Sequence, residues 1–222
     1  MKAIWRYLAP VSLLILCAPF AGAQTGADLA IGFGTAHVSA NSGGIDNLNS
    51  VNALGACTPN TGDPDCQSLP TLSGLFMGFQ GNLMLTKRYG FGGEVNFQPS
   101  RENYGPLQSR QIFYDFNGVY APINEKSFAV TLQGGVGGAR TSFILPTTAC
   151  VGTVACTNEN EPLINASHFQ VHVGAGVSIY VKGNFFVRPQ FDFHFVPGLN
   201  NQFGSNAVPE GTVWVGYAFG RD

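Results

Sequence analysis

A histidine and a serine two positions apart, His37 and Ser39, are the one arrangement in this sequence that indicates catalysis. Alternate residues of a strand share a face, so the imidazole could activate the hydroxyl as a nucleophile. A catalytic base also needs a group that orients it, and no Asp or Glu is placed by spacing to do so. We therefore expect both residues to be ordinary side chains at the end of a strand, with catalysis as the alternative.

Three of the four histidines, His168, His172 and His194, raise the question of a metal site. His168 and His172 lie on one face of a segment in which every second residue is apolar. His194 lies on the corresponding face of the next segment. Metal sites need several ligands at fixed positions, and no third ligand is fixed by spacing here. The prediction from the sequence is no metal and no cofactor.

Four cysteines outside the N-terminal segment form two local pairs, Cys57 with Cys66 and Cys150 with Cys156. Each pair lies in a segment rich in Gly, Thr, Pro and Asn, which is typical of a loop. In an oxidising compartment such pairs form disulfides, so we predict the bonds Cys57–Cys66 and Cys150–Cys156. Zinc binding is the rival interpretation, but neither pair has the Cys-x-x-Cys spacing or a neighbouring His.

Charged residues make up only 11% of the chain, and several occur in segments that are otherwise apolar at every second position. They share one face of those segments. An unpaired buried charge is costly, so we expect a polar network in which Arg188 bridges Glu94 or Asp115 across an interior. The predicted network comprises Glu94, Asp115, His172, Arg188, Asp192 and His194.

These residues are carried by eight segments in which apolar and polar side chains alternate, most clearly between His168 and Val196. A period of two predicts β-strands. The turn Lys182-Gly183-Asn184 divides that stretch into a hairpin, because Gly and Asn accept the positive φ of a tight turn. The expected strands span residues 28–40, 72–86, 90–98, 109–121, 127–143, 168–181, 185–196 and 211–219.

The connections between these strands alternate between long and short, and the longest are residues 41–70 and 144–165. Outer-membrane barrels have short periplasmic turns and long external loops. Each strand also has the roughly 9–11 residues that cross a bilayer at a tilt. The pattern predicts an all-β fold, an eight-stranded antiparallel up-and-down transmembrane β-barrel with its Phe-rich face toward lipid. A soluble lipocalin-like barrel would instead place Glu94, Arg188 and Asp192 in water.

The first 23 residues are typical of an export signal, with Lys2 and Arg6 before an apolar stretch and Ala21-Gly22-Ala23 as the cleavage site. We predict a signal peptide at residues 1–23, a barrel domain at residues 24–222 and a location in the bacterial outer membrane. The formal charge of −2 and the lack of a basic run argue against a nucleic-acid partner.

Between Asp28 and Phe219 the chain resembles the OmpA/OmpX/OmpW-type family of small outer-membrane barrels in strand count, loop alternation and terminal strand. In that family the last strand carries alternating apolar residues and closes on an aromatic, as Val213, Val215, Tyr217 and Phe219 do here. The resemblance implies that the barrel-assembly machinery and outer-membrane lipid are partners. We expect a monomer.

The expected function is a structural or surface-interaction role, with a lumen filled by side chains, since eight strands enclose just enough room for them. One alternative is an enzyme that acts on lipid A or phospholipid through His37 and Ser39, which are similar to the His-x-Ser of outer-membrane lipid A deacylases. The other is a conduit for small apolar molecules.

Overall fold

The computed structural model of the chain describes residues 26–38, 44–46, 55–57, 66–68, 71–104, 107–151 and 155–220. Within these ranges the side chains of residues 44–46, 55–57, 67–68, 147–151 and 155–164 are not described. The predicted export signal, residues 1–23, and Ser39 lie outside the described part, so both predictions stand untested.

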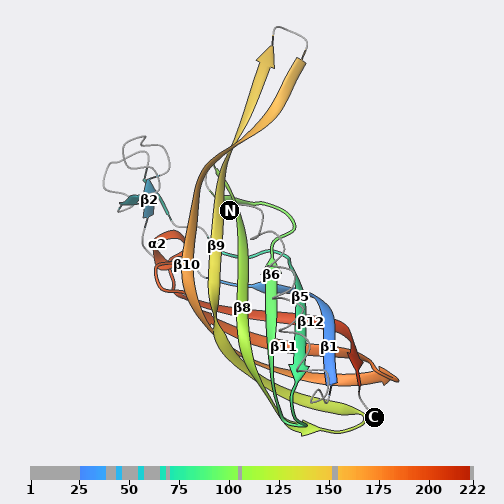
Figure 1. Ribbon diagram of the computed structural model, residues 1–222. Coiled ribbons are helices and arrows are strands. Elements are labelled where there is room, and N and C mark those ends of the chain that lie inside the picture. Colours follow the sequence, from blue (N-terminus) through green and yellow to red (C-terminus); the bar gives the residue numbers. More distant parts are fainter. Residues whose placement is uncertain are drawn as a thin grey trace, which may run out of the picture.

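Eight antiparallel strands close into a barrel (Figure 1). Each strand pairs with its neighbour along the chain, β6 pairs with β8, and β12 returns to pair with β1 from Ala27 opposite Phe219 to Ala36 opposite Glu210. Closure leaves no unpaired sheet edge around the wall, which a lipid environment requires. The predicted fold is confirmed. The strands are β1 (Gly26–Ala36), β5 (Phe76–Met84), β6 (Tyr89–Phe97), β8 (Leu107–Asn124), β9 (Phe128–Val151), β10 (Ala155–Lys182), β11 (Phe185–Phe195) and β12 (Ala207–Phe219).

The barrel wall is apolar on the outside and polar on the inside. Strand β11 shows this alternation clearly, because Phe191 and Phe193 are exposed while Gln190, Asp192 and His194 are buried. Exposed Val, Ile, Leu and Phe side chains continue the apolar outer face around the other strands. A surface of this kind is unfavourable in water and favourable in hydrocarbon, so the barrel is built to span a bilayer.

The segment from residue 144 to residue 165, predicted as a loop, is instead a two-stranded ribbon that continues β9 and β10 (Figure 1). Strand β8 leaves β9 at Ile144, and β11 leaves β10 at Val171, so the ribbon projects beyond the barrel. Its sequence lacks the apolar alternation of a half-buried strand, and Pro146 and Pro162 mark it as irregular. Prolines occur on edge strands, and within the described residues each strand of the ribbon has one free outer edge.

Several short strands and a helix lie at the end of the barrel from which the ribbon projects. Strands β2 (Gly44–Asp46), β3 (Gly55–Cys57) and β4 (Cys66–Ser68) form a three-stranded sheet in the order β3-β2-β4, and β7 (Glu102–Tyr104) pairs with β8. The short helix α2 (Asn200–Phe203) lies between β11 and β12. Among the described residues, no helix has the length and apolar character that a membrane crossing requires.

Strand β12 begins at Ala207, earlier than the predicted residue 211, although it then contains Pro209. The carbonyl of Pro209 accepts a hydrogen bond from His37 N on the β1 side at 3.0 Å. The missing N–H of the proline therefore faces that same side, where β1 has already ended at Ala36. The longer strand carries Glu210 into the barrel, opposite Asp192.

An apolar cluster, here called the mouth cluster, fills the end of the barrel that carries the long connections. Helix α2 and its flank contribute Leu199 and Phe203, and the Tyr104 ring packs edge-on against Phe143 and Phe203 at 4.8 and 5.4 Å. The Tyr104 hydroxyl donates to the Gln202 carbonyl at 2.5 Å, and burial raises the pKa of this hydroxyl. The cluster comprises Ala36, Val38, Leu72, Phe76, Tyr104, Leu107, Phe113, Ala139, Phe143, Val196, Leu199, Phe203 and Val208.

Candidate functional site

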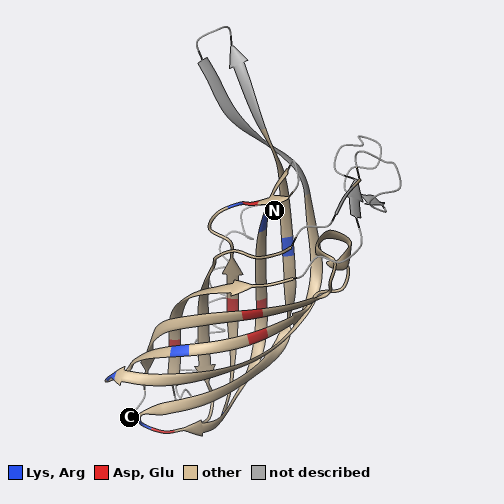
Figure 2. Cartoon of the chain, turned by 180° about the vertical axis from the view of Figure 1, so that it is seen from behind, with Lys and Arg blue, Asp and Glu red and all other residues tan. Residues whose placement is uncertain are grey.

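A buried network of polar and charged side chains occupies the middle of the barrel, between the mouth cluster and a smaller apolar cluster around Phe186 and Trp214. Figure 2 shows that charged positions are few along the strands and that the acidic ones gather near mid-barrel. All six residues of the predicted network lie inside the barrel and are buried. They are Glu94, Asp115, His172, Arg188, Asp192 and His194.

Glu94 on β6 lies at the centre of this network. Gln80, Gln133 and Gln190, from three other strands, each donate a side-chain N–H to its Oε2 at 2.8, 3.1 and 3.0 Å. Asn96 donates to Oε1 at 2.6 Å. Four amide donors on one carboxylate replace the water that the group loses on burial. Alternation in their segments predicts that these glutamines face the lumen, but the predicted network did not include them.

Arg188 on β11 has a different partner from the predicted one. Its Nη2 forms an ion pair with Asp28 of β1 at 2.8 Å, and its other nitrogens donate to Gln80 at 2.6 Å and to Ser178 at 2.7 Å. The prediction of a bridge to Glu94 or Asp115 is wrong because Arg188 lies nearer the periplasmic end. There the β1 wall presents Asp28 to it.

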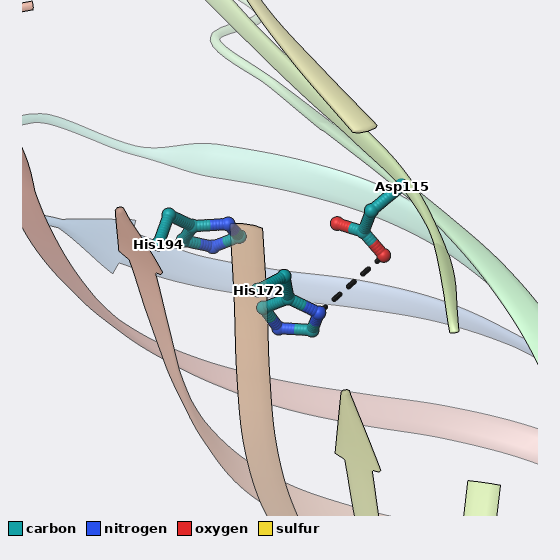
Figure 3. Close-up of side chains that lie close together, drawn as sticks. All are labelled: Asp115, His172 and His194. Atoms are coloured by element: carbon teal, nitrogen blue, oxygen red, sulfur yellow. Dashed lines mark ion pairs between the residues drawn. The ribbon is translucent and has the colours of Figure 1, made fainter. Parts of the chain in front are cut away.

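Two histidines on adjacent strands, His172 on β10 and His194 on β11, lie directly opposite each other with their rings stacked at 4.7 Å. His172 Nε2 donates to Asp192 at 2.9 Å, and His194 Nε2 donates to Glu210 at 3.1 Å. Asp115 approaches His172 Nδ1 to 3.5 Å from β8 (Figure 3). The histidines are thus held between carboxylates from several strands.

Glycines on β9 and β10 make room for these contacts. Strand β9 lies between β8 and β10 and presents Gly135 and Gly137 at the level of His172 and Asp115. A Cβ at Gly135 would clash with the Asn117 side chain, and one at Gly174 would clash with Asp192. The absence of side chains at these positions lets groups from non-adjacent strands meet.

The structure adds two acids that the sequence analysis did not include, Asp28 and Glu210. Asp28 was expected at the start of the first strand, and Glu210 lies just before residue 211, the predicted start of the eighth strand. With them the middle of the barrel can hold protons or a cation among buried carboxylates and imidazoles.

The catalytic candidates His37 and Ser39 follow the end of β1 in the sequence. His37 is exposed just beyond β1, and Ser39 lies outside the described residues, so the pair stays an untested prediction. His168 is half-buried and lies 3.2 Å from the Gln202 side-chain oxygen, away from the two lumen histidines. It is therefore not part of the histidine cluster that the sequence left open.

The predicted disulfides lie largely outside the described side chains. Cys66 is disulfide-bonded, but the side chain of Cys57 is not described, so the pairing stays a prediction. The backbones of Cys150 and Cys156 lie opposite each other in the β9–β10 register. The bond between them stays a prediction.

No protein-family model matches the chain, and no curated protein matches it either. Several solved structures are similar. Ail of Yersinia pestis shares 13% identity over 87% of this chain and 99% of its own, with a TM-score of 0.43. The N-terminal β-barrel domain of Pseudomonas aeruginosa OprF shares 10% over 88% and 98%, with a TM-score of 0.44. Neisserial surface protein A shares 10% over 87% and 96%, with a TM-score of 0.48.

These likenesses say nothing about partners or activity, and the barrel itself carries the identification. Its eight strands close without an edge, the lipid-facing wall is apolar, and the charged residues near mid-barrel, among them Glu94, Asp115, Arg188 and Asp192, are buried inside. Short turns join the strands at one end and long connections at the other, as in barrels whose long loops are external. The chain has the fold of the small eight-stranded β-barrels of the bacterial outer membrane.

Proposed function

We propose that the chain is a non-conducting outer-membrane barrel that presents its β9–β10 ribbon to partners at the cell surface. The observation that carries the proposal is the projection of this ribbon from the external end of the barrel. Surrounding lipid and the barrel-assembly machinery are the other partners of the proposal, and the outward row Val213, Val215 and Phe219 on β12 is the feature that the machinery would recognise.

The proposal that the lumen does not conduct is supported by what fills it. Thirteen buried apolar residues pack at the external end, and bulky polar side chains such as Arg188 and Gln190 follow below them. An eight-stranded barrel has an interior that side chains can fill. We expect planar bilayers containing the folded protein to show no steady single-channel steps. Stable conductance from the unmodified protein would contradict this.

The proposal that the ribbon mediates contacts is supported by its backbone. Beyond Ile144 the outer edge of β9 has no strand beside it, and the same holds for β10 before Val171, among the described residues. Unpaired edge groups can hydrogen-bond an extended segment of another protein. The ribbon thus offers a main-chain binding surface away from the membrane.

A shortened ribbon tests this role. Pro146 and Asn160 lie opposite each other, so an Asn-Gly turn can replace residues 147–159 and close the hairpin at a lower level. We expect cells that display this variant to lose the aggregation or surface adhesion that the full chain confers, with the barrel still folded. Because the deletion removes Cys150 and Cys156, the matched control is the full-length chain with both cysteines replaced by Ser. Equal adhesion by the full and shortened chains would exclude the ribbon as the contact surface.

A further inference from the structure

Three potential metal ligands converge in the lumen from three strands (Figure 3). Asp115 of β8, His172 of β10 and His194 of β11 each offer a ligand atom, and these atoms lie within 4.8 Å of one another. Asp115 Oδ1 and His172 Nδ1 are already 3.5 Å apart. Ligand atoms around tetrahedral zinc lie roughly 3.3 Å apart, so an ion would draw the cluster together by at most about 1.5 Å.

One atom of this cluster has an unused lone pair. His194 is fully buried, and its Nδ1 has no hydrogen-bond partner. Its Nε2 lies 3.1 Å from Glu210 Oε2, and a carboxylate accepts a hydrogen bond, so the ring proton belongs on Nε2. Nδ1 is then an unprotonated acceptor with nothing to accept, which is costly inside a protein. A metal ion would use this lone pair.

Both histidines have an outer carboxylate partner, as metal-binding histidines do, and the two stacked rings would turn so that both lone pairs reach one ion. His194 Nε2 donates to Glu210, which leaves its Nδ1 open to an ion. His172 Nε2 donates to Asp192, and its Nδ1 faces the oxygens of Asn117 and Asp115, so this nitrogen would give up a proton to bind an ion. A carboxylate on the far nitrogen fixes the ring tautomer and makes the near nitrogen a stronger ligand. Two histidine–carboxylate pairs on neighbouring strands are stronger evidence for a metal site than two histidines alone.

A further oxygen faces the same point. Asn117 Oδ1 lies 3.0 Å from His172 Nδ1, and the Asn117 amide nitrogen donates to Asp115 Oδ1. The carboxylate and the amide oxygen thus both crowd the nitrogen that faces away from Asp192. Strand β9 lies between β8 and β10, and it has glycines, Gly135 and Gly137, at this level. Asp115 and Asn117 can therefore contact His172 across β9.

The charges of the lumen also favour a cation. Glu94, Asp115, Asp192 and Glu210 are buried carboxylates around the histidine pair. The buried cation Arg188 forms its ion pair with Asp28, which is not one of these four. Burial disfavours the ionised form of these acids, and a divalent ion beside Asp115 would stabilise that form.

We propose that the barrel binds a divalent transition-metal ion, with zinc as its best fit, through Asp115, His172 and His194, and that the side-chain oxygen of Asn117 is the fourth ligand. Imidazole and carboxylate ligands suit such ions, and binding involves no redox step. Any proton on a ligand atom passes to solvent as the ion binds. The ion would join β8, β10 and β11 across the lumen. Because the site is buried under the mouth cluster, we expect the ion to enter while the barrel folds.

The test is refolding of the mature chain from urea into detergent with Zn²⁺, with Co²⁺ or with EDTA. After folding, EDTA washing removes surface ions, and elemental analysis counts what remains. We expect about one ion per chain in protein folded with metal and far less when Zn²⁺ is added after folding. A visible ligand-field spectrum from trapped Co²⁺, distinct from that of aqueous Co²⁺, is the second expected result.

Variants identify the ligands. Asp115→Asn and His194→Gln should lose the retained ion, whereas His168→Gln, outside the cluster, should keep it. Glu210→Gln, a change in a positioning residue, should lower zinc affinity about 10–100-fold. Zinc during folding should raise the urea midpoint of the wild type but not of Asp115→Asn.

The inference is overturned if the wild type retains no ion, or if Asp115→Asn and His194→Gln retain as much as His168→Gln. Should these variants fail to fold, the Co²⁺ spectrum of the wild type decides alone. The aqueous spectrum after folding with Co²⁺ would then overturn the site. These outcomes are independent of ribbon-mediated adhesion.

Discussion

The middle of the barrel and its external mouth are both filled with buried side chains, but they are built from opposite chemistry. In the mouth cluster, Phe143 and Phe203 pack on the Tyr104 ring through apolar contacts. In the middle, Glu94 is held by hydrogen bonds from glutamines of three other strands, and Arg188 is held by an ion pair. Each region fills the same narrow lumen.

The difference lies in what each region demands of a residue. Apolar contacts are non-directional, so the mouth depends on total volume and tolerates a change of shape. The middle depends on donors and acceptors that meet in pairs, and a side chain of equal size cannot replace one of them. We therefore expect size-preserving substitutions to separate the two regions.

Arg188→Ala should have the largest effect. It leaves Asp28 without its ion pair and removes donors from Gln80 and Ser178. Removing one partner of a buried ion pair costs about 3–5 kcal/mol of unfolding free energy. Urea unfolding in detergent, followed by the mobility difference between boiled and unboiled protein, measures this loss.

Two further variants check the cause of that loss. Asp28→Asn combined with Arg188→Met should recover part of it, because neither charge is then left alone. Arg110 lies on the outside of the barrel, where its side chain donates to the Gln98 carbonyl at 2.7 Å. Arg110→Ala should therefore lower the free energy of unfolding by only about 0.5–1.5 kcal/mol. Equal losses for Arg188→Ala and Arg110→Ala would show that the network is not what holds the middle.

Sequence alternation could predict which residues face the lumen, because the side of a strand follows from its period. It could not predict that Arg188 meets Asp28. These residues lie two strands apart, and their relative height depends on the stagger of the barrel wall, which no single segment encodes. For the same reason, alternation predicts that His194 and Asp115 both face the lumen, but it does not predict that they lie close together.

Strand ends were harder to predict than strand faces. Pro209 marks a break in the sequence, yet β12 runs through it because β1 has ended beside it. The sequence of the ribbon beyond Ile144 has no apolar alternation, so no such pattern predicts it, and backbone pairing alone defines its strands. Both cases depend on what lies next to the segment rather than on its own residues.

Gln190→Leu sharpens the comparison at nearly constant size and should have the second-largest effect. Gln190 donates to Glu94 at 3.0 Å and to Asp192 at 2.9 Å. Leucine leaves both carboxylates short of a donor, and an unsatisfied buried group costs about 1–3 kcal/mol. The urea midpoint should fall clearly below that of the wild type. An unchanged midpoint would mean that water or other side chains replace the amide.

Leu199→Met in the mouth cluster is the matched apolar substitution and should have the smallest effect. Leu199 is fully buried next to helix α2, and its contacts within the cluster are apolar. Methionine has a similar volume and can bend to fill the same space, so we expect the free energy of unfolding to fall by less than about 1.5 kcal/mol.

Gln190→Leu and Leu199→Met both preserve size at fully or nearly fully buried positions. The ratio of their losses in unfolding free energy therefore separates the contribution of directional hydrogen bonds from that of packing. A loss for Leu199→Met that equals or exceeds that for Gln190→Leu would mean that the mouth is as specific in shape as the middle is in hydrogen bonding. In that case precise packing at the mouth, and not volume alone, would hold the external end of the barrel closed.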